Sequence, residues 1–330
     1  MTLPPLLRLL LWPLSVLYGG LMQLRVGLYT KGIFEQKRLN RPVISVGNLT
    51  MGGTGKTPMV IWLAERFLAQ GKRVGILSRG YKGSASTSDE VELMKARLKQ
   101  RAQFGVAANR YAEGKKLEDR VEVFLLDDGF QHLELARDVN ILLLDGSKKL
   151  NEEWLLPAGE LREPIREAGR ADLVVITRKA EHRTIEGDHS HTYKIFYAET
   201  QLLGFRDLAS ADTGMYLREI GPGPFFAFCG IGNPQAFLKD LGRWHVPVCG
   251  HITFRDHHRY SKSDFRSLEK AAMAVHAAGF VTTEKDWINL KHLGPLNLPT
   301  FVCVITLSLQ SESEFDACLA RKLSPGGTSS

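Results

Sequence analysis

The chain has 330 residues, of which 44% are hydrophobic, so it is long enough to bury a sizeable core and to form two domains. Its formal net charge of +7 is spread over many positions, without a long Lys/Arg run or interleaved basic and aromatic residues. We therefore expect no nucleic-acid partner. The four cysteines lie far apart, which argues against a disulfide framework or a zinc site and favours a reducing cytoplasm.

The first segment, residues 1–30, is almost wholly apolar, and Pro13 and a pair of glycines interrupt it. A helix that crosses a bilayer needs about 20 apolar residues, so this stretch is barely long enough. Trp12, Tyr18 and Tyr29 can anchor it at an interface, and flanking basic side chains can meet lipid phosphates. We expect a membrane-associating segment that lies in the interface. The alternatives are a helix that crosses the bilayer and a helix buried against the domain.

Apolar runs of strand length follow, separated by helical stretches. The runs lie at 42–48, 73–78, 121–128, 139–145 and 172–178. Near-continuous apolar strands are typical of a parallel sheet with helices on both faces. Two short alternating runs within 193–220 have no helix between them and indicate an extended ribbon. From residue 224 the strand and helix patterns start again, with helices near 234–243 and 261–278, which predicts a smaller α/β domain.

These patterns divide the chain into five expected segments. They are the apolar segment 1–30, a nucleotide-binding core at 31–192, a β-ribbon linker or hinge at 193–223, a smaller α/β domain at 224–323 and a disordered tail at 324–330.

The stretch TMGGTGKT at 50–57 almost satisfies the phosphate-loop signature G-x-x-x-x-G-K-[ST], with Thr50 in place of the first glycine. It follows an apolar strand and precedes a helix that ends at Gly71, which is the expected context for such a loop. The side chain of Lys56 would reach the β- and γ-phosphates, and the Thr57 hydroxyl would ligate Mg²⁺. The residues expected to bind the nucleotide are Thr50, Met51, Gly52, Gly53, Thr54, Gly55, Lys56 and Thr57. We infer a P-loop NTPase-like core.

The helix after this loop, within PMVIWLAERFLAQGK, is expected to carry one apolar face. The residues of that face are Val60, Leu63, Ala64, Phe67 and Leu68.

Two further groups of polar residues are candidates for chemistry. Asp127 and Asp128 follow a buried strand directly, where a P-loop enzyme needs an acidic residue to hold its metal ion, although such residues can also cap a turn. The stretch FRDHHRY places His257 and His258 on a loop, where a catalytic or phosphate-binding role is favoured over a zinc site. By composition alone, SRGYKG at 78–83 and TSDE at 87–90 are either ordinary polar loops or part of a site.

Eight motifs occur in order along almost the whole chain. They are NLTMGGTGKTP, LSRGYKG, SDE, LLDDGFQH, LPAGELREP, FCGIGNP, FRDHHRY and TTEKD. Together they resemble the tetraacyldisaccharide 4'-kinase family of lipid A biosynthesis, in which the loop tolerates Thr or Ser at the position of Thr50. That family uses ATP and Mg²⁺ to phosphorylate the 4'-hydroxyl of a lipid disaccharide 1-phosphate, forming lipid IVA, at the cytoplasmic face of the bacterial inner membrane. The resemblance implies the same substrate, cofactors and peripheral or monotopic location, with no obligatory protein partner.

The resemblance also implies residue roles. Lys56 and Thr57 act on phosphate and metal, with Asp127 and Asp128 beside them. Asp89, in SDE, matches the family's proposed general base for the sugar hydroxyl, and His257 matches the histidine that pairs with it. The possible cleft residues are Tyr81, Glu90, Arg110, Gln131, His132, Arg162 and Glu163.

Two positions depart from the family pattern. The family more often has GDE where this chain has SDE, and Lys82 looks like an insertion into the family's SRGYG.

Asp89 follows the second strand of the core, whereas His257 lies beyond the ribbon. We therefore expect the two domains to close, with the ribbon as a hinge, and so bring the two side chains together.

Two other functions remain as alternatives. A P-loop NTPase of the metal-chaperone or partition type would carry a lysine where this chain has Met51, and a GTPase would show [NT]-K-x-D, an order that TRKA at 177–180 and TEKD at 283–286 both break. A membrane-tethered nucleotide-binding scaffold would need no base, so the pair of Asp89 and His257 argues against it.

Overall fold

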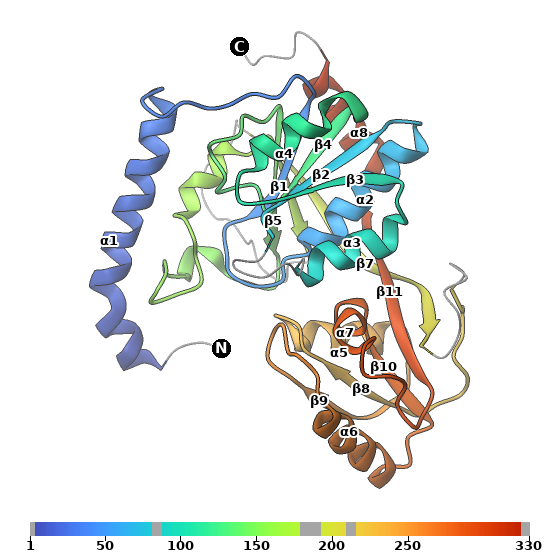
Figure 1. Cartoon of the computed structure of the whole chain (residues 1–330). Coiled ribbons are helices and arrows are strands. Elements are labelled where there is room, and N and C mark those ends of the chain that lie inside the picture. The colour runs from blue at the N-terminus through green and yellow to red at the C-terminus, as the bar shows by residue number, and fades with distance from the viewer. Residues whose placement is uncertain (1–3, 81–87, 179–192, 209–215, 325–330) are drawn as a thin grey trace. The chain divides into compact units, whose positions relative to one another are not determined.

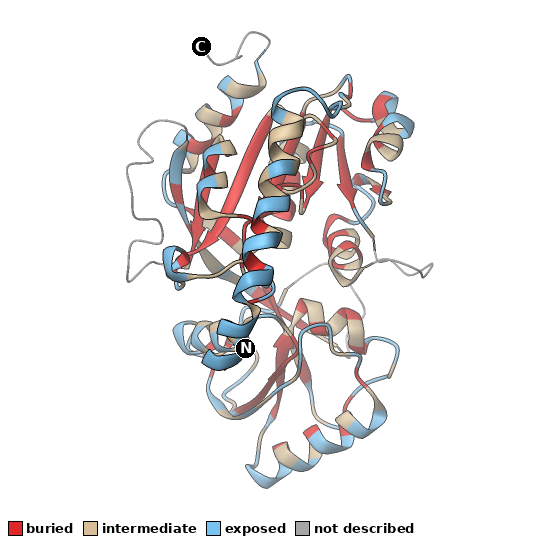
Figure 2. Cartoon of the chain, turned by 90° about the vertical axis from the view of Figure 1, so that its left-hand side faces the viewer, coloured by how far each residue is buried: buried red, intermediate tan, exposed pale blue. Residues whose placement is uncertain are grey.

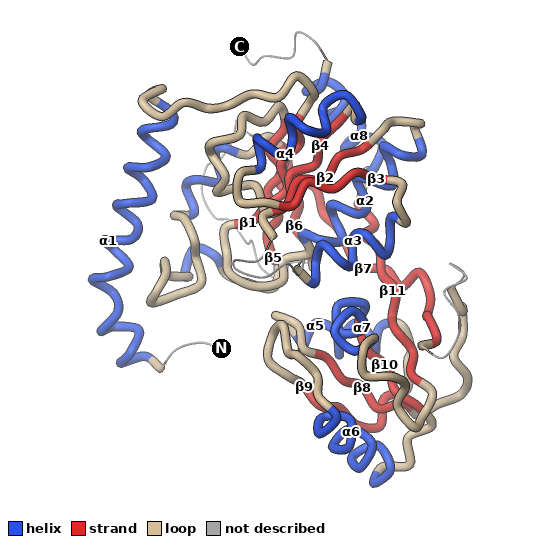
Figure 3. Tube along the Cα trace, viewed as in Figure 1, coloured by secondary structure: helices blue, strands red, loops and turns tan. Residues whose placement is uncertain are grey.

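The structure is a computed structural model that describes residues 4–80, 88–178, 193–208 and 216–324. It divides into two compact units, each formed from segments that are not contiguous in sequence. Unit 1 comprises residues 1–84, 98–199 and 307–330, and unit 2 comprises residues 85–97 and 200–306. Figure 1 labels their helices and strands, and Figure 3 distinguishes helix, strand and loop along the chain.

A parallel sheet forms the centre of unit 1. Its strands are β1 (Val43–Asn48), β2 (Val74–Ser78), β3 (Ala102–Val106), β4 (Val123–Asp127), β5 (Val139–Asp145), β6 (Leu173–Thr177) and the first part of β7 (Lys194–Asp207). The order is β3-β2-β4-β1-β5-β6-β7, and each neighbouring pair is parallel. Every residue of β1, β2, β4, β5 and β6 is buried, as the red strands of Figure 2 show. This explains their near-continuous apolar sequences and confirms the expected parallel sheet.

Helices α2 (Lys56–Ala69), α4 (Arg110–Leu117) and α8 (Glu312–Leu323) pack on the sheet of unit 1. Unit 1 also contains α1 (Pro5–Thr30) and short 3₁₀ helices at Glu118–Arg120, Leu150–Glu152 and Ile165–Arg170. The buried surface of α2 is broader than the single apolar face expected from sequence, because Met59, Ile61 and Trp62 are also buried. Trp62 is covered because α8 packs on α2, where Phe315 meets Trp62 edge to face at 5.6 Å.

Unit 2 is a second α/β unit. Its strands are β8 (Phe225–Cys229), β9 (Val248–Thr253), β10 (Gly279–Thr283) and most of β11 (Thr300–Leu309), and its helices are α3 (Asp89–Leu98), α5 (Pro234–Arg243), α6 (Lys262–Ala274) and α7 (Glu284–Leu290). The strand order β11-β10-β8-β9 is again parallel. Ser261 opens α6 with a capping box to Asp264. The expected ribbon is β7 with an antiparallel bridge from Phe205 to Leu217.

The compact units are not the continuous ranges expected from sequence, because two helices pack in the other unit from the one that their sequence positions predict. Helix α3 follows β2 in sequence but packs in unit 2, where the buried guanidinium of Arg97 binds both carboxylate oxygens of Glu284 at 3.0 and 2.9 Å. Helix α8 returns to unit 1, where Glu312 accepts a hydrogen bond of 2.8 Å from Arg66 on α2. Each helix is therefore placed by contacts with residues distant in sequence.

Helix α1 lies on the outside of unit 1, and most of its surface is exposed (Figure 2). It runs through Pro13 without a break, and only Ser15 and Gly19 are buried, so most of the helix is not buried against the domain. Among the described residues it is the one helix long and apolar enough to cross a membrane. Ser15 donates to the Leu155 carbonyl at 2.9 Å, and a Cβ at Gly19 would lie 2.6 Å from the Leu155 side chain. One narrow face therefore attaches the helix to unit 1.

Candidate active site

The glycine-rich loop of unit 1 connects the end of β1 to the start of α2. Gly52 and Gly55 have φ values of +101° and +88°, in the left-handed region that favours glycine. Thr50 is buried in an antiparallel bridge with Leu161, and the Met51 N–H donates to the Glu160 carbonyl at 2.8 Å. The segment LPAGELREP therefore holds the start of the loop in extended pairing, which explains why a threonine fits where the signature has glycine.

The remaining loop residues are also held by unit 1. The Thr54 carbonyl accepts a hydrogen bond from Thr177 at 3.1 Å, and the Gly53 carbonyl accepts one from Arg178 at 3.2 Å. Thr57 is the second residue of α2 and is half-buried. The loop thus ends at a helix N-terminus, whose free N–H groups and partial positive charge suit a phosphate group.

Lys56, the first residue of α2, points toward the acidic residues that follow β4. Its Nζ lies 3.0 Å from Asn48 Oδ1 and 3.5 Å from Asp128 Oδ1. Burial lowers the pKa of Lys56, and the charge of Asp128 acts in the opposite direction. Asn48 also donates to the Thr50 carbonyl at 2.7 Å. Asn48 is a site residue that the sequence motifs did not predict, although its position at the end of β1 was a usable signal.

The expected acidic pair lies on the strand next to β1. Asp127 is buried at the end of β4 and accepts a hydrogen bond of 3.1 Å from Ser78. Burial, and next the charge of Asp128, raise the pKa of Asp127 to about 6. Burial acts to raise the pKa of Asp128 as well, but Lys56 and Arg162 outweigh it and hold that pKa below its ordinary value. Both oxygens of Asp128 lie 2.9 Å from Arg162 Nη1.

Some of the expected cleft residues of unit 1 contact the phosphate loop or the acidic pair, and others do not. Arg110 donates to the Asp128 carbonyl at 3.2 Å, and Gln131 donates to the Asn48 carbonyl at 2.9 Å, so both support the acidic pair and the loop, as Arg162 does. Glu163 is fully buried and paired with Arg170, and burial raises its pKa. Burial lowers the pKa of His132 to about 4, so its imidazole is neutral at pH 7. Tyr81 lies outside the described residues, as does Lys82.

The second polar cluster lies wholly within unit 2. Asp89 is the first residue of α3, which begins here because the Ser88 hydroxyl accepts a hydrogen bond from the Val91 N–H at 3.3 Å. His257 Nδ1 lies 3.2 Å from Asp89 Oδ2. This contact lowers the pKa of Asp89 and raises that of His257, against the effect of partial burial on each. Glu90 completes this side of the cluster, with Oε1 3.6 Å from His257 Nε2.

The expected closure of two domains is therefore wrong as an explanation of how Asp89 and His257 meet. Both residues belong to unit 2, because α3 does not pack on the sheet of unit 1 although it follows β2 in sequence. It packs beside α7. Their contact needs no movement between domains. The neighbouring His258 is turned elsewhere, stacked on Phe254 at 4.6 Å and 3.2 Å from Asp264, so it belongs to the start of α6.

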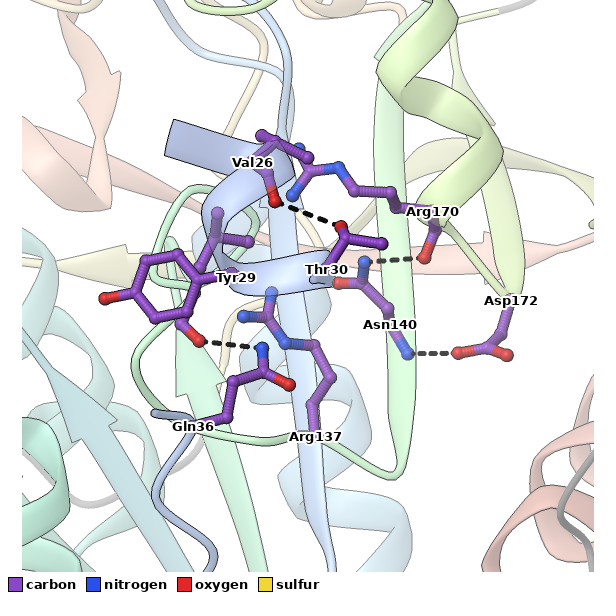
Figure 4. Close-up of a pocket in the computed structure, with 9 residues that line it drawn as sticks. Val26, Tyr29, Thr30, Gln36, Arg137, Asn140, Arg170 and Asp172 are labelled. Atoms are coloured by element: carbon purple, nitrogen blue, oxygen red, sulfur yellow. Dashed lines mark hydrogen bonds between the residues drawn. The ribbon is translucent and has the colours of Figure 1, made fainter. Parts of the chain in front are cut away.

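A pocket of about 250 Å³ lies at the C-terminal end of α1 (Figure 4). Its lining residues are Val26, Tyr29, Thr30, Gln36, Leu133, Arg137, Asn140, Arg170 and Asp172. Several of them bond to one another: Thr30 donates to the Val26 carbonyl at 3.0 Å, and Asn140 to the Arg170 carbonyl at 2.9 Å. None of these residues belongs to the phosphate loop, the acidic pair or the expected cleft residues, so this pocket is not the nucleotide site.

Within residues 4–80, 88–178, 193–208 and 216–324, no group of three or more His, Cys, Asp or Glu side chains is arranged to hold a metal ion. The side chains of Asp127 and Asp128 nevertheless offer the oxygen donors that Mg²⁺ prefers, together with the hydroxyl of Thr57. Mg²⁺ commonly takes only one or two carboxylates and completes its shell with phosphate oxygens and water. The donor set therefore fits a magnesium ion that binds together with a nucleotide.

The site defines the class of protein. A glycine-rich loop between a parallel strand and a helix, a lysine at the first helical position and an acidic pair at the end of the neighbouring strand are the parts of a P-loop phosphate-binding site. A family model described as tetraacyldisaccharide-1-P 4'-kinase matches residues 7–324. The chain belongs to this family and is an enzyme, a tetraacyldisaccharide 4'-kinase, rather than a metal-chaperone NTPase or a scaffold.

Individual relatives are similar to this chain along almost its whole length. The tetraacyldisaccharide 4'-kinase of Geobacter metallireducens is 39% identical over 342 aligned residues, which cover 95% of this chain and 98% of the relative. That of Geobacter sulfurreducens is 35% identical and covers 94% and 92%. The crystal structure of LpxK from Aquifex aeolicus in complex with ATP is 32% identical, covers 96% of this chain and all of that one, and superposes with a TM-score of 0.76.

Proposed function

We propose that the chain transfers the γ-phosphoryl group of ATP to the 4'-hydroxyl of a tetraacyldisaccharide 1-phosphate, a lipid A precursor, and so forms lipid IVA. The observation that carries the phosphotransfer is the contact of 3.2 Å between His257 Nδ1 and Asp89 Oδ2, in a chain that also has a phosphate loop. A protein that only binds nucleotide needs no base, whereas a kinase must remove a proton from its acceptor.

Unit 1 supplies the nucleotide half of the proposed reaction. The N–H groups at the start of α2 and the ammonium of Lys56 would bind the β- and γ-phosphates. Thr57, Asp127 and Asp128 would hold Mg²⁺, which neutralises phosphate charge when it is bound. Burial raises the pKa of Asp127 more than Lys56 and Arg110 lower it, so a bound divalent ion would add the positive charge that favours its ionised form.

Unit 2 supplies the base. The carboxylate of Asp89 would take the proton of the 4'-hydroxyl as that oxygen bonds to the γ-phosphorus. The bond from the γ-phosphorus to the bridging oxygen breaks, and ADP leaves with that electron pair. His257 holds Asp89 at Oδ2, which leaves Oδ1 for the incoming proton. Lys56 stabilises the negative charge on the phosphoryl oxygens during transfer.

Helix α1 would place the enzyme on the cytoplasmic face of the bacterial inner membrane. Its exposed apolar residues are Leu6, Leu7, Leu9, Leu10, Trp12, Leu14, Val16, Leu17, Leu21 and Leu24. Three basic residues were expected to meet lipid phosphates. Arg8 pairs with Glu153 at 2.7 Å and Arg25 donates to the Gln131 carbonyl at 3.0 Å, whereas Lys31 is exposed. Apolar contact would therefore supply most of the attachment, with α1 lying in the interface and Lys31 placed to meet a lipid phosphate.

The test of this proposal is mass spectrometry of lipids after incubation with ATP. The enzyme is mixed with ATP, Mg²⁺ and a tetraacyldisaccharide 1-phosphate in detergent micelles, beside the variant Asp89→Ala. We expect the lipid to gain one phosphate group with the wild type and far less with the variant. ADP release that needs no lipid, without a phosphorylated lipid, would overturn the proposal.

A further inference from the structure

Helix α7 (Glu284–Leu290) presents two side chains to the Asp89–His257 pair. Lys285 and Asn289 are four residues apart, so they lie on the same side of the helix, one turn from each other. Asn289 Nδ2 donates to Asp89 Oδ2 at 2.9 Å. Lys285 Nζ lies 3.3 Å from His257 Nε2. Each member of the pair therefore has its own partner on one short helix.

The two bonds to Asp89 end on the same oxygen. Asn289 Nδ2 and His257 Nδ1 both lie within hydrogen-bond distance of Oδ2. An amide nitrogen can only donate, so Asn289 fixes the rotation of the carboxylate and favours its ionised form. Oδ1 is thereby the oxygen left to receive a proton from an acceptor hydroxyl.

Lys285 sits among the groups that face the other ring nitrogen of His257. Its Nζ lies 2.7 Å from Asp256 Oδ1 and 3.4 Å from Glu90 Oε1. Those two carboxylates lie 3.8 and 3.6 Å from His257 Nε2 and would favour a second proton on the ring. An ammonium has no lone pair, so the Nε2 that faces it must act as acceptor. The ring proton then belongs on Nδ1, where it can be donated to Asp89.

We propose that Lys285 and Asn289 are positioning residues of the phosphoryl-transfer site, Asn289 fixing Asp89 by its Oδ2 and Lys285 keeping His257 in the neutral tautomer with its proton on Nδ1. This inference rests on the proposed function of Asp89 as the base. Neither residue touches a reacting atom, and both act through the pair.

The direct test for Lys285 is ¹⁵N NMR of histidine-labelled enzyme without substrate, with His257→Gln used to assign the His257 signals. At alkaline pH, above the raised pKa of His257, we expect the wild-type ring to show a protonated Nδ1 and an unprotonated Nε2. The substitution Lys285→Met removes the cation beside Nε2 and leaves Glu90 and Asp256 unopposed, so the pKa of His257 should rise. Lys291→Met, which removes an exposed lysine just after α7, is the matched control and should leave that pKa unchanged.

The test for Asn289 is the pH dependence of kcat/KM. Asn289→Ala removes a donor from Asp89, so the acid limb should move to higher pH by roughly 0.5 to 1 unit, the size expected for one neutral hydrogen bond. His257 and Lys285 still act on Asp89 in this variant. Asn289→Gln, which keeps an amide donor, should restore part of the shift. Circular dichroism and thermal melting of each variant establish that it is folded.

The outcomes separate the two proposals. An unshifted His257 pKa in Lys285→Met, or an unshifted acid limb in Asn289→Ala, would overturn the positioning roles even if Asp89→Ala is inactive. If Asp89→Ala retains activity, the assigned base is wrong, and the NMR result still decides whether Lys285 sets the state of His257.

Discussion

Asp128 and His257 share an unusual backbone conformation. Their φ values are +46° and +57°, in the left-handed region that residues other than glycine seldom occupy. Holding such a residue there costs of order 1 kcal/mol or more, and six other described residues besides glycine share the conformation, so it does not by itself mark a functional residue. In both cases the conformation directs a titratable group at its charged partner, Lys56 or Asp89.

Lys56 is the residue whose loss should be most severe. The substitution Lys56→Ala removes the cation that meets the β- and γ-phosphates, and we expect kcat to fall by roughly 100- to 1000-fold or more. Steady-state kinetics with Lys72→Ala as a control, which removes an exposed lysine of the same unit, measures the effect. Near-normal turnover in Lys56→Ala would refute the phosphate-loop assignment.

The Asp89–His257 pair should also make stability depend on pH. The lowered pKa of Asp89 contributes stability that is lost as pH falls through its folded value, and the raised pKa of His257 contributes stability that is lost as pH rises through its folded value. The window therefore lies between the ordinary values of 3.8 and 6.5.

Urea unfolding of wild type and His257→Gln tests this dependence. We expect a difference in unfolding free energy of about 0.5 to 1 kcal/mol near pH 5, because the pair is partly exposed, and a smaller difference near pH 9. His276→Gln, at an exposed histidine, serves as the control. A difference that grows toward pH 9 would show that the charged pair is not what stabilises this contact.

At the scale of elements, the ion pair between Arg97 and Glu284 attaches α3 to the start of α7. Both side chains are almost fully buried, and their nearest atoms are 2.9 Å apart. The substitution Arg97→Met leaves Glu284 buried without this cation, so we expect a loss of roughly 3 to 5 kcal/mol in the free energy of unfolding. Denaturant unfolding monitored by fluorescence gives this quantity.

The matched control lies on the same helix. Lys95→Met removes a partly exposed lysine that pairs with Glu92, and we expect its effect to stay within about 0.5 kcal/mol. If the two substitutions are equally mild, the placement of α3 in unit 2 does not depend on the buried ion pair.

Much of the fold could be predicted because its signals are local. Strands that are buried on both faces appear in the sequence as apolar runs. Gly71, with φ of +76°, follows the C-terminal cap of α2 as its position predicted. The placement of α3 could not be predicted, because Arg97 and Glu284 are 187 residues apart in sequence. Lys285 and Asn289 were missed for the same reason, since their roles depend on partners that only the folded chain brings near. Asn48 was missed although its partners Thr50 and Lys56 are close in sequence.

At the scale of the whole molecule, α1 gives the chain two kinds of surface. One face is attached to unit 1 through residues such as Ser15, and apolar side chains between Leu6 and Leu24 are exposed on the rest. We expect the triple substitution of Leu10, Leu14 and Leu17 by Gln to lower partitioning onto phospholipid vesicles by at least about tenfold, since burial of each leucine contributes roughly 1.5 to 3 kcal/mol.

Vesicle flotation measures this partitioning. The control is Met273→Gln, which removes an exposed apolar side chain from α6 and should leave flotation unchanged. Equal flotation of the triple variant and the wild type would show that α1 does not attach the enzyme to lipid.

The central claim is that Asp89 and His257 act as one unit in phosphoryl transfer to a lipid hydroxyl. The most direct measurement is kcat for Asp89→Ala, His257→Ala and the double variant, with ATP and tetraacyldisaccharide 1-phosphate as substrates. Residues that act as a unit give non-additive losses, so each single variant should be strongly impaired and the double variant little worse than the poorer single one. Losses that multiply strictly, or a fully active His257→Ala enzyme, would contradict the account.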